Sequence, residues 1–156
     1  HVAEKNGWTR FVSMQNHWNL LYREEEREMA PLCVDQGVGI IPWSPLARGR
    51  LARAPETKTA RTESDPFGKR LYAPMQEADA RVVAALDDVA RARQLPHAQV
   101  ALAWLVQKRG VTAPIVGATR LQHLEDAVAS LAVKLTSDEV RALEAAYLPH
   151  PVAGHG

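Results

Sequence analysis

Apolar positions along the chain follow two periods, one typical of strands and one typical of helices. Short runs rich in β-branched and aromatic residues predict three buried strands, at about residues 9 to 15, 38 to 43 and 112 to 117. The second run is almost continuously apolar, which is typical of a strand in a parallel sheet covered on both faces. We therefore expect these strands to form a parallel sheet.

Apolar residues at helical spacing fill the segments before, between and after the strands. Gly37, Pro96 and Gly110 each end or interrupt such a segment. Thr136 and Glu139 have the spacing of a capping box at the start of the last helix. The predicted helices lie at residues 2 to 5, at a stripe of Met29, Leu32, Cys33 and Gln36, and at about 75 to 93, 97 to 109, 121 to 130 and 137 to 147.

Strands and helices alternate at βαβ spacing, which implies parallel strands joined by right-handed crossovers. The order fits the C-terminal portion, about strands 6 to 8, of an α/β (β/α)8 TIM barrel, with residues 1 to 156 in one domain. Residues 47 to 74 lack periodicity and predict a long functional loop. Because the chain begins inside a helix and without Met, we expect a fragment whose N-terminal half of the barrel lies upstream.

Composition narrows the possible partners. The 156 residues are 46% hydrophobic and 24% charged with a net charge of +1, so bulk charge favours neither nucleic acid nor an acidic membrane surface. A single cysteine excludes an internal disulfide, no apolar run approaches the ~20 residues of a membrane span, and a cytoplasmic protein is expected. The six histidines lack metal-ligand spacing, so we predict no metal.

Several other polar residues have ordinary interpretations. Cys33, in mid-helix, is expected to be a small packed residue rather than a nucleophile. The REEERE run at residues 23 to 28 is expected to form a solvated helix face. His150 and His155 lie in the C-terminal tail and are expected to be exposed.

The first two predicted strands end in residues suited to a ring and an anion. Gln15 and Asn16 carry amides that could recognise a carboxamide, or could satisfy the backbone of a turn. Trp43 offers a flat apolar face, and the segment from Ser44 to Gly49 offers backbone N–H groups to a pyrophosphate. A core tryptophan followed by a proline turn is the alternative.

The third strand end leads into a helix. Gly117 permits close approach of a ligand, Thr119 could cap the helix, and the free N–H groups at its start favour an anion. Arg120 adds a guanidinium suited to phosphate. A capped helix with a solvated arginine would look the same.

Four motifs in this order resemble the C-terminal half of the aldo-keto reductases, and most closely a bacterial branch that includes relatives of the potassium-channel β subunits. They are SMQNHWNLLYREEEREM, IPWSPLARGRL, ALAWLVQ and APIVGATRLQHLEDAV. The resemblance covers essentially the whole chain. It implies an NADPH-dependent oxidoreductase that reduces aldehydes and ketones by hydride transfer.

The resemblance also assigns a cofactor site. It places Gln15 on the nicotinamide carboxamide and Trp43 on the nicotinamide ring, and it places Thr119 and Arg120 on the 2′-phosphate of NADP(H). The other cofactor-binding residues are Ser44, Leu46, Ala47 and Gly49 for the pyrophosphate, Gly117 beside the phosphate clamp, Arg61 as a weaker phosphate contact, His123 one turn after the clamp, and Asp126 for adenine. Ala127 stands where Asn is common in the family, so one adenine contact is expected to be missing.

The family's catalytic Asp, Tyr, Lys and His come from strands that precede this region, so no catalytic residue is predicted here. His17 and Tyr22 belong to the downstream motif and are not expected to replace them. A small carbonyl compound is the expected substrate, without further identification, and an oligomer is possible. A nucleotide-sensing regulatory module and an inactive truncated product are the alternatives.

Overall fold

Three segments of the chain pair with one another in parallel. In the computed structural model, which describes residues 1–54 and 65–152, β1 (Ser13–Met14) pairs with β2 (Gly39–Ile40) in parallel register. A parallel bridge joins Ile40 to Val111, and Ile115 N donates to Pro42 O at 2.8 Å. The predicted parallel arrangement of all three segments is confirmed.

The strands are much shorter than predicted. Regular pairing covers two residues in each of β1 and β2, and the predicted strand at 112 to 117 contributes only isolated contacts after Val111. Pro42 and Pro114 have no N–H group and cannot donate between β2 and the third segment. On the β1 side, Ile41 N and Trp43 N still donate to Met14 O and Asn16 O. The strand predictions were therefore correct about the parallel direction of the strands and wrong about their length.

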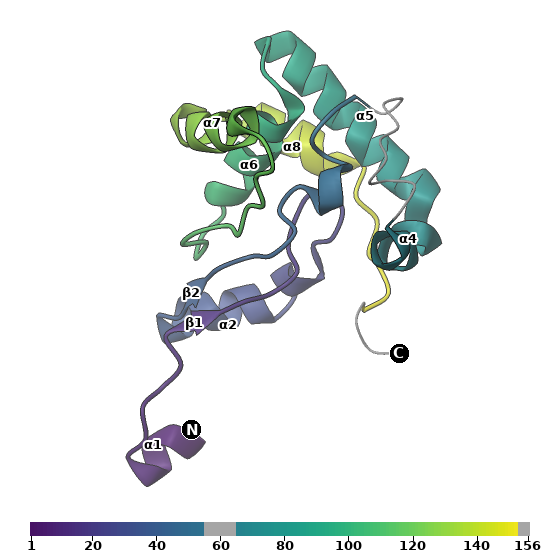
Figure 1. The fold of residues 1–156 in the computed structure, drawn as a ribbon. Helices are drawn as coiled ribbons and strands as arrows, with labels where there is room; N and C mark the ends of the chain where they lie inside the picture. The colour runs from purple at the N-terminus through teal and green to yellow at the C-terminus, as the bar shows by residue number, and fades with distance from the viewer. Residues whose placement is uncertain (55–64, 153–156) are drawn as a thin grey trace.

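Most of the helices gather to one side of β1 and β2 (Figure 1). α5, α6, α7 and α8 gather together, while α2 lies against β1 and β2, and α1 projects away on an extended segment. The α-helices are α1 (Val2–Asn6), α2 (Met29–Gln36), α4 (Pro66–Tyr72), α5 (Gln76–Arg93), α6 (His97–Val106), α7 (Leu121–Ala129) and α8 (Ser137–Ala145). The 3-10 helices are η1 (Glu24–Glu26), η2 (Ala47–Gly49), η3 (Ala73–Met75) and η4 (Ser130–Ala132).

The helix predictions succeed where apolar spacing is regular. The helix predicted at about 97 to 109 is found as α6, and its apolar residues Val100, Ala101, Trp104 and Leu105 are all buried. The Thr136 side chain accepts a hydrogen bond from Glu139 N, and Glu139 bonds back to the cap, so the capping box is confirmed. The helix predicted from Met29 to Gln36 is confirmed as α2, and Cys33 is packed as expected, but Leu32 is exposed and Ala30 is the other buried position.

The predicted loop at 47 to 74 contains helical structure at both ends. Within the described part, η2 follows β2, and α4 precedes η3. The start of α4 is set by Asp65, whose carboxylate accepts a hydrogen bond from Gly68 N, and by Pro66 at the first helical position. The Asp65-Pro66 pair is a helix-start signal in the sequence. It was missed because the segment lacks apolar periodicity.

Apolar side chains are exposed in two parts of the chain, one before β1 and one from the third segment through α7 and η4. On the β1 side, Phe11 is 89% exposed and Trp8 is 65% exposed. From the third segment through α7 and η4, the exposed apolar residues are Ile115, Val116, Leu121, Leu124, Val128 and Leu131. Exposed apolar patches of this kind promote association.

The purified chain is therefore expected to self-associate. Sedimentation velocity should show an average mass that rises with concentration, because exposed apolar faces and open sheet edges pair with each other. Val128→Glu places a charge on the exposed face of α7 and should reduce association, while Glu125→Gln on the same helix should not. A concentration-independent monomer would contradict this expectation.

Candidate functional site

The first two strand ends lie side by side. Gln15 follows β1 and is exposed, and a parallel bridge pairs His17 with Trp43 just beyond β2. Trp43 N also donates to Asn16 O at 2.8 Å. The backbone ladder therefore brings the predicted amide and the predicted ring platform to neighbouring positions.

A ring stack covers one face of Trp43. The centroid of the His17 ring lies 4.1 Å from that of Trp43 at an interplanar angle of 12°, and Tyr22 stacks on His17 at 4.3 Å and 14°. The stack fixes the plane of a tryptophan that is only partly buried. One ring face is thus covered by protein, which suits a platform that binds a flat ligand on its other face.

His17 is held at one ring nitrogen. Its Nε2 lies 3.0 Å from the Tyr72 hydroxyl, and Asn19 Nδ2 lies 3.2 Å from both groups. Burial, aided by the nearby positive charge of His150, lowers the pKa of His17 to about 4, so the ring is neutral at neutral pH. Asn19 also donates to Ser44 O at 2.9 Å, which links this cluster to the following loop.

The loop after Trp43 has an unusual backbone. Ser44, Ala47 and Arg48 have φ values of 51°, 47° and 56°, and Gly49 has a φ of 96°. These left-handed residues turn the loop tightly, and within it Ala47 N donates to Ser44 O and Gly49 N donates to Leu46 O, both at 2.9 Å. Some of the backbone N–H groups are therefore already paired, and the pyrophosphate role of this loop, including the partly buried Leu46, stays a prediction.

The two arginines beside Gly49 are already engaged. Arg48 forms an ion pair with Asp65, with Nε at 2.5 Å from Oδ2, and its guanidinium lies over Phe67 at 5.2 Å. Arg50 lies over the Tyr72 ring at 5.0 Å. Both cations face α4 and its cap, so neither is the best candidate for a phosphate contact.

The third strand end presents its predicted residues on the surface. Gly117, Thr119, Arg120 and His123 are exposed, and Arg120 is the N-cap of α7. The expected cap by Thr119 was wrong: its hydroxyl lies 3.5 Å from His123 Nδ1, because the helix begins one residue later than a Thr119 cap requires.

Two predicted contacts stand apart from this group. Asp126 accepts hydrogen bonds from Gln99 Nε2 at 2.9 Å and Gln122 Nε2 at 3.2 Å, so its carboxylate is oriented by two amides. Arg61 lies outside the described residues. The ladder from Ile115 to Pro42 connects the α7 end of the site to Trp43.

A second polar cluster anchors the C-terminal tail, and the sequence did not reveal it. His150, expected to be exposed, is only 8% exposed: Nε2 lies 2.9 Å from Asp79 Oδ1, and Nδ1 lies 2.8 Å from Leu148 O. Both ring nitrogens face acceptors, so both must donate and the ring is charged. Burial opposes this charge, but the bond and charge of Asp79 raise the pKa of His150 above its usual value.

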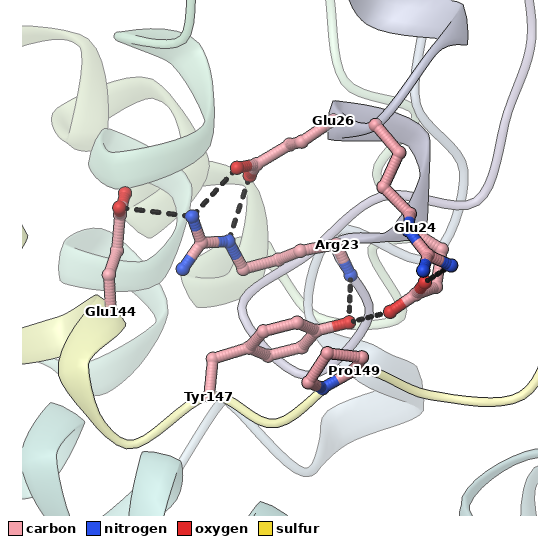
Figure 2. Close-up of a pocket in the computed structure, with 7 residues that line it drawn as sticks. Arg23, Glu24, Glu26, Glu144, Tyr147 and Pro149 are labelled. Carbon is pink, nitrogen blue, oxygen red and sulfur yellow. Dashed lines mark hydrogen bonds and ion pairs between the residues drawn. The ribbon is translucent and has the colours of Figure 1, made fainter.

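The REEERE run is also more than a solvated face. Figure 2 shows Arg23 between Glu26 and Glu144, with Tyr147 and Glu24 beside them. Burial opposes the charge of Glu24, but hydrogen bonds from Tyr147 and His150 N lower the pKa of this carboxyl. These residues border an open hollow of about 260 Å³ whose charges are largely paired.

Two further findings concern ligands and membranes. Within residues 1–54 and 65–152, no group of three or more His, Cys, Asp or Glu side chains is arranged to hold a metal ion. In the same part of the chain, no helix has both the length and the apolar character needed to cross a membrane.

Comparison with known proteins identifies the family. The sequence model of the aldo/keto reductase family matches residues 1–148. An aldo-keto reductase of Fusarium vanettenii is 46% identical over 157 aligned residues, which cover 99% of this chain and 42% of that protein. A versiconal hemiacetal acetate reductase of Aspergillus parasiticus is 41% identical, over 97% of this chain and 45% of that protein. The named relatives are fungal, and placement in a bacterial branch stays a prediction.

A solved structure shares the fold. The crystal structure of the thermostable aldo-keto reductase Tm1743 in complex with the inhibitor epalrestat matches with a TM-score of 0.61 and 24% identity, covering 88% of this chain and 40% of that one. This chain thus spans less than half the length of the proteins it matches. By the family match over residues 1–148 and by its relatives, the chain belongs to the aldo/keto reductase family.

Proposed function

We propose that this chain is the NADP(H)-binding part of an oxidoreductase that reduces aldehydes or ketones to alcohols. The observation that carries the proposal is the adjacent placement of Gln15 and Trp43 at two parallel strand ends, with the third strand end hydrogen-bonded beside them. In parallel barrels, ligands bind at such ends. Family membership supports the reaction class, and NADP(H) and the barrel position at about strands 6 to 8 are proposals.

The residues present fit this cofactor. Trp43 has one face covered by His17, so a nicotinamide would stack on the other face, with the Gln15 amide at its carboxamide. The tightly turned loop from Ser44 to Gly49 would receive the pyrophosphate. When bound, the cofactor supplies a hydride, and these side chains bind and orient it.

The 2′-phosphate would lie at the start of α7. Arg120 is exposed there, next to backbone N–H groups that have no helical partner, and the two effects together favour an anion. His123 lies one turn further, and Asp126, fixed by two glutamine amides, would face the adenine.

Acid–base chemistry is proposed to come from residues outside this chain. The remaining strands of the barrel would cover the exposed apolar faces and would bring a general acid to the carbonyl oxygen. The purified chain is therefore expected to show no carbonyl reduction with NADPH. Turnover by the chain alone would contradict this assignment, while turnover by a fusion carrying the N-terminal part of the Fusarium relative would support it.

Arg120→Ala is expected to weaken NADPH binding by roughly 10- to 100-fold, because a charged hydrogen bond to phosphate is lost. NADH lacks the 2′-phosphate, so its dissociation constant should change by less than about twofold. Calorimetric titration of both nucleotides measures the difference. Arg109→Ala, which removes an exposed arginine near the opposite end of the third segment, is the matched control. Equal effects of Arg120→Ala on both nucleotides would overturn the 2′-phosphate assignment.

A further inference from the structure

Tyr72 occupies a position that no part of the cofactor site explains. It ends α4, is 1% exposed, and lies far along the chain from the residues that its hydroxyl contacts. Of those residues, His17 stacks on Trp43, and Asn19 donates to the backbone of the next residue, Ser44. A buried hydroxyl needs hydrogen-bond partners. The partners of the Tyr72 hydroxyl include His17, the residue whose ring supports Trp43.

The hydrogen-bond directions in this cluster follow from the inventory of donors. Asn19 Oδ1 accepts from Leu21 N and Tyr22 N, so its Nδ2 group faces the Tyr72 oxygen and donates to it. The Tyr72 proton is then available for His17 Nε2 at 3.0 Å. His17 must accept at Nε2, which makes it a neutral ring with its proton on Nδ1.

This arrangement fixes the His17 ring. Stacking between Tyr22 and Trp43 sets the plane of the imidazole, but the ring turned by a half-turn about the Cβ–Cγ bond would stack equally well. The bond from Tyr72 removes that freedom. His17 Nδ1 has no hydrogen-bond partner within the described residues, so the orientation depends on Nε2.

Tyr72 also contacts the loop that follows Trp43. Arg50 lies over its ring at 5.0 Å, and Arg48 is paired with Asp65, the cap of the same helix α4. The helix is therefore attached to both sides of Gly49. A shift of α4 would move the loop and the Tyr72 hydroxyl together.

We propose that Tyr72 is a positioning residue, which acts through His17 to hold the Trp43 ring in the orientation that accepts the nicotinamide. The inference rests on the proposed function for its effect on cofactor affinity, and on geometry alone for its effect on His17 and Trp43. It makes α4 part of the cofactor site, although the helix itself need not touch the cofactor.

The test compares two tyrosine-to-phenylalanine variants of the 156-residue chain. Tyr72→Phe keeps the ring under Arg50 and removes the bond to His17. Tyr147→Phe is the control, because its hydroxyl donates to Glu24 at 2.7 Å and accepts from Arg23 N at 2.9 Å. Both variants lose buried hydrogen bonds, so both should lower stability in urea by similar amounts.

Three readouts separate positioning from stability. Tyr72→Phe should weaken NADPH binding roughly three- to tenfold, the effect of one ordinary hydrogen bond. It should shift the indole NMR signal of Trp43, identified with Trp43→Phe. It should also shift the ring NMR signals of His17, because the bond at Nε2 is lost, while burial and the charge of His150 keep the pKa of the ring low. Tyr147→Phe should leave all three unchanged.

The outcomes are distinct for the two proposals. If Tyr72→Phe leaves the Trp43 signal and the His17 ring signals as in Tyr147→Phe, the positioning role is overturned. If the original chain binds no NADPH, the proposed function fails, and the two NMR readouts still decide the role of Tyr72. Should Tyr72→Phe not fold, His17→Phe breaks the same bond from the other side while keeping a stacked ring, and it should shift the Trp43 signal and weaken NADPH equally; no change would overturn the inference.

Discussion

Replacing Trp104 with alanine is expected to lower the free energy of unfolding by about 3–5 kcal/mol. Trp104 is 1% exposed in α6 and packs in the common core of the helices. Its indole N–H donates to Glu144 Oε1 at 2.8 Å, and the Lys108 ammonium lies 4.6 Å from its ring centroid. Alanine would leave a cavity and would remove the surface on which these polar groups rest.

Two matched variants separate packing from hydrogen bonding. Trp104→Phe keeps most of the ring volume and loses the indole donor, so a cost of about 1 kcal/mol is expected. Trp8→Ala removes a tryptophan that is 65% exposed and should change stability by no more than about 0.5 kcal/mol. Urea unfolding of the three variants measures the differences. Similar losses for Trp8→Ala and Trp104→Ala would show that α6 is not the centre of the core.

Breaking the buried pair of His150 and Asp79 is expected to cost about 3–5 kcal/mol, because His150→Ala leaves a carboxylate buried without its partner. The side chains of the pair are only 5% and 4% exposed. The double variant His150→Ala/Asp79→Ala should lose less than the sum of the single variants. His97→Ala is the control: His97 pairs with Asp87 at 2.9 Å in a more exposed place, and a smaller loss is expected.

The same pair predicts a dependence of stability on pH. The folded-state pKa of His150 lies above its unfolded value, so the folded protein binds the proton more tightly. Its contribution is complete below about pH 6.5 and is lost as the pH rises through the raised folded value. Urea unfolding from about pH 6 to 9 should show this decline in the original chain and not in His150→Ala. Parallel pH profiles would contradict a charged His150.

Local patterns predicted the helices well because each depends on neighbouring residues. Regular apolar spacing located α5 and α6, and the capping box located the start of α8. The three strand ends were predicted in the correct relation, since parallel strands place their carboxyl ends at one edge. Strand length was not predicted correctly. Pro42 and Pro114 cannot donate to a neighbouring segment, and a run of apolar residues does not show this limit.

Contacts between distant segments could not be predicted from local patterns. The buried His150 contacts Asp79, which is 71 positions away, and Glu24, which is 126 positions away. Each of these residues alone resembles a surface residue. Tyr72 was missed for the same reason, although Asp65-Pro66 could have signalled the helix that carries it. The pairing of His17 with Trp43 follows from parallel register and could have been anticipated once the strands were aligned.

The most direct test of the central proposal is a calorimetric titration of the 156-residue chain with NADPH and with NADH. We expect saturable NADPH binding that is at least tenfold tighter than NADH binding and that is severely weakened by Trp43→Ala, which removes the ring platform. Absence of NADPH binding, or equal affinity for both nucleotides with no effect of Trp43→Ala, would contradict the proposal that these strand ends hold NADP(H).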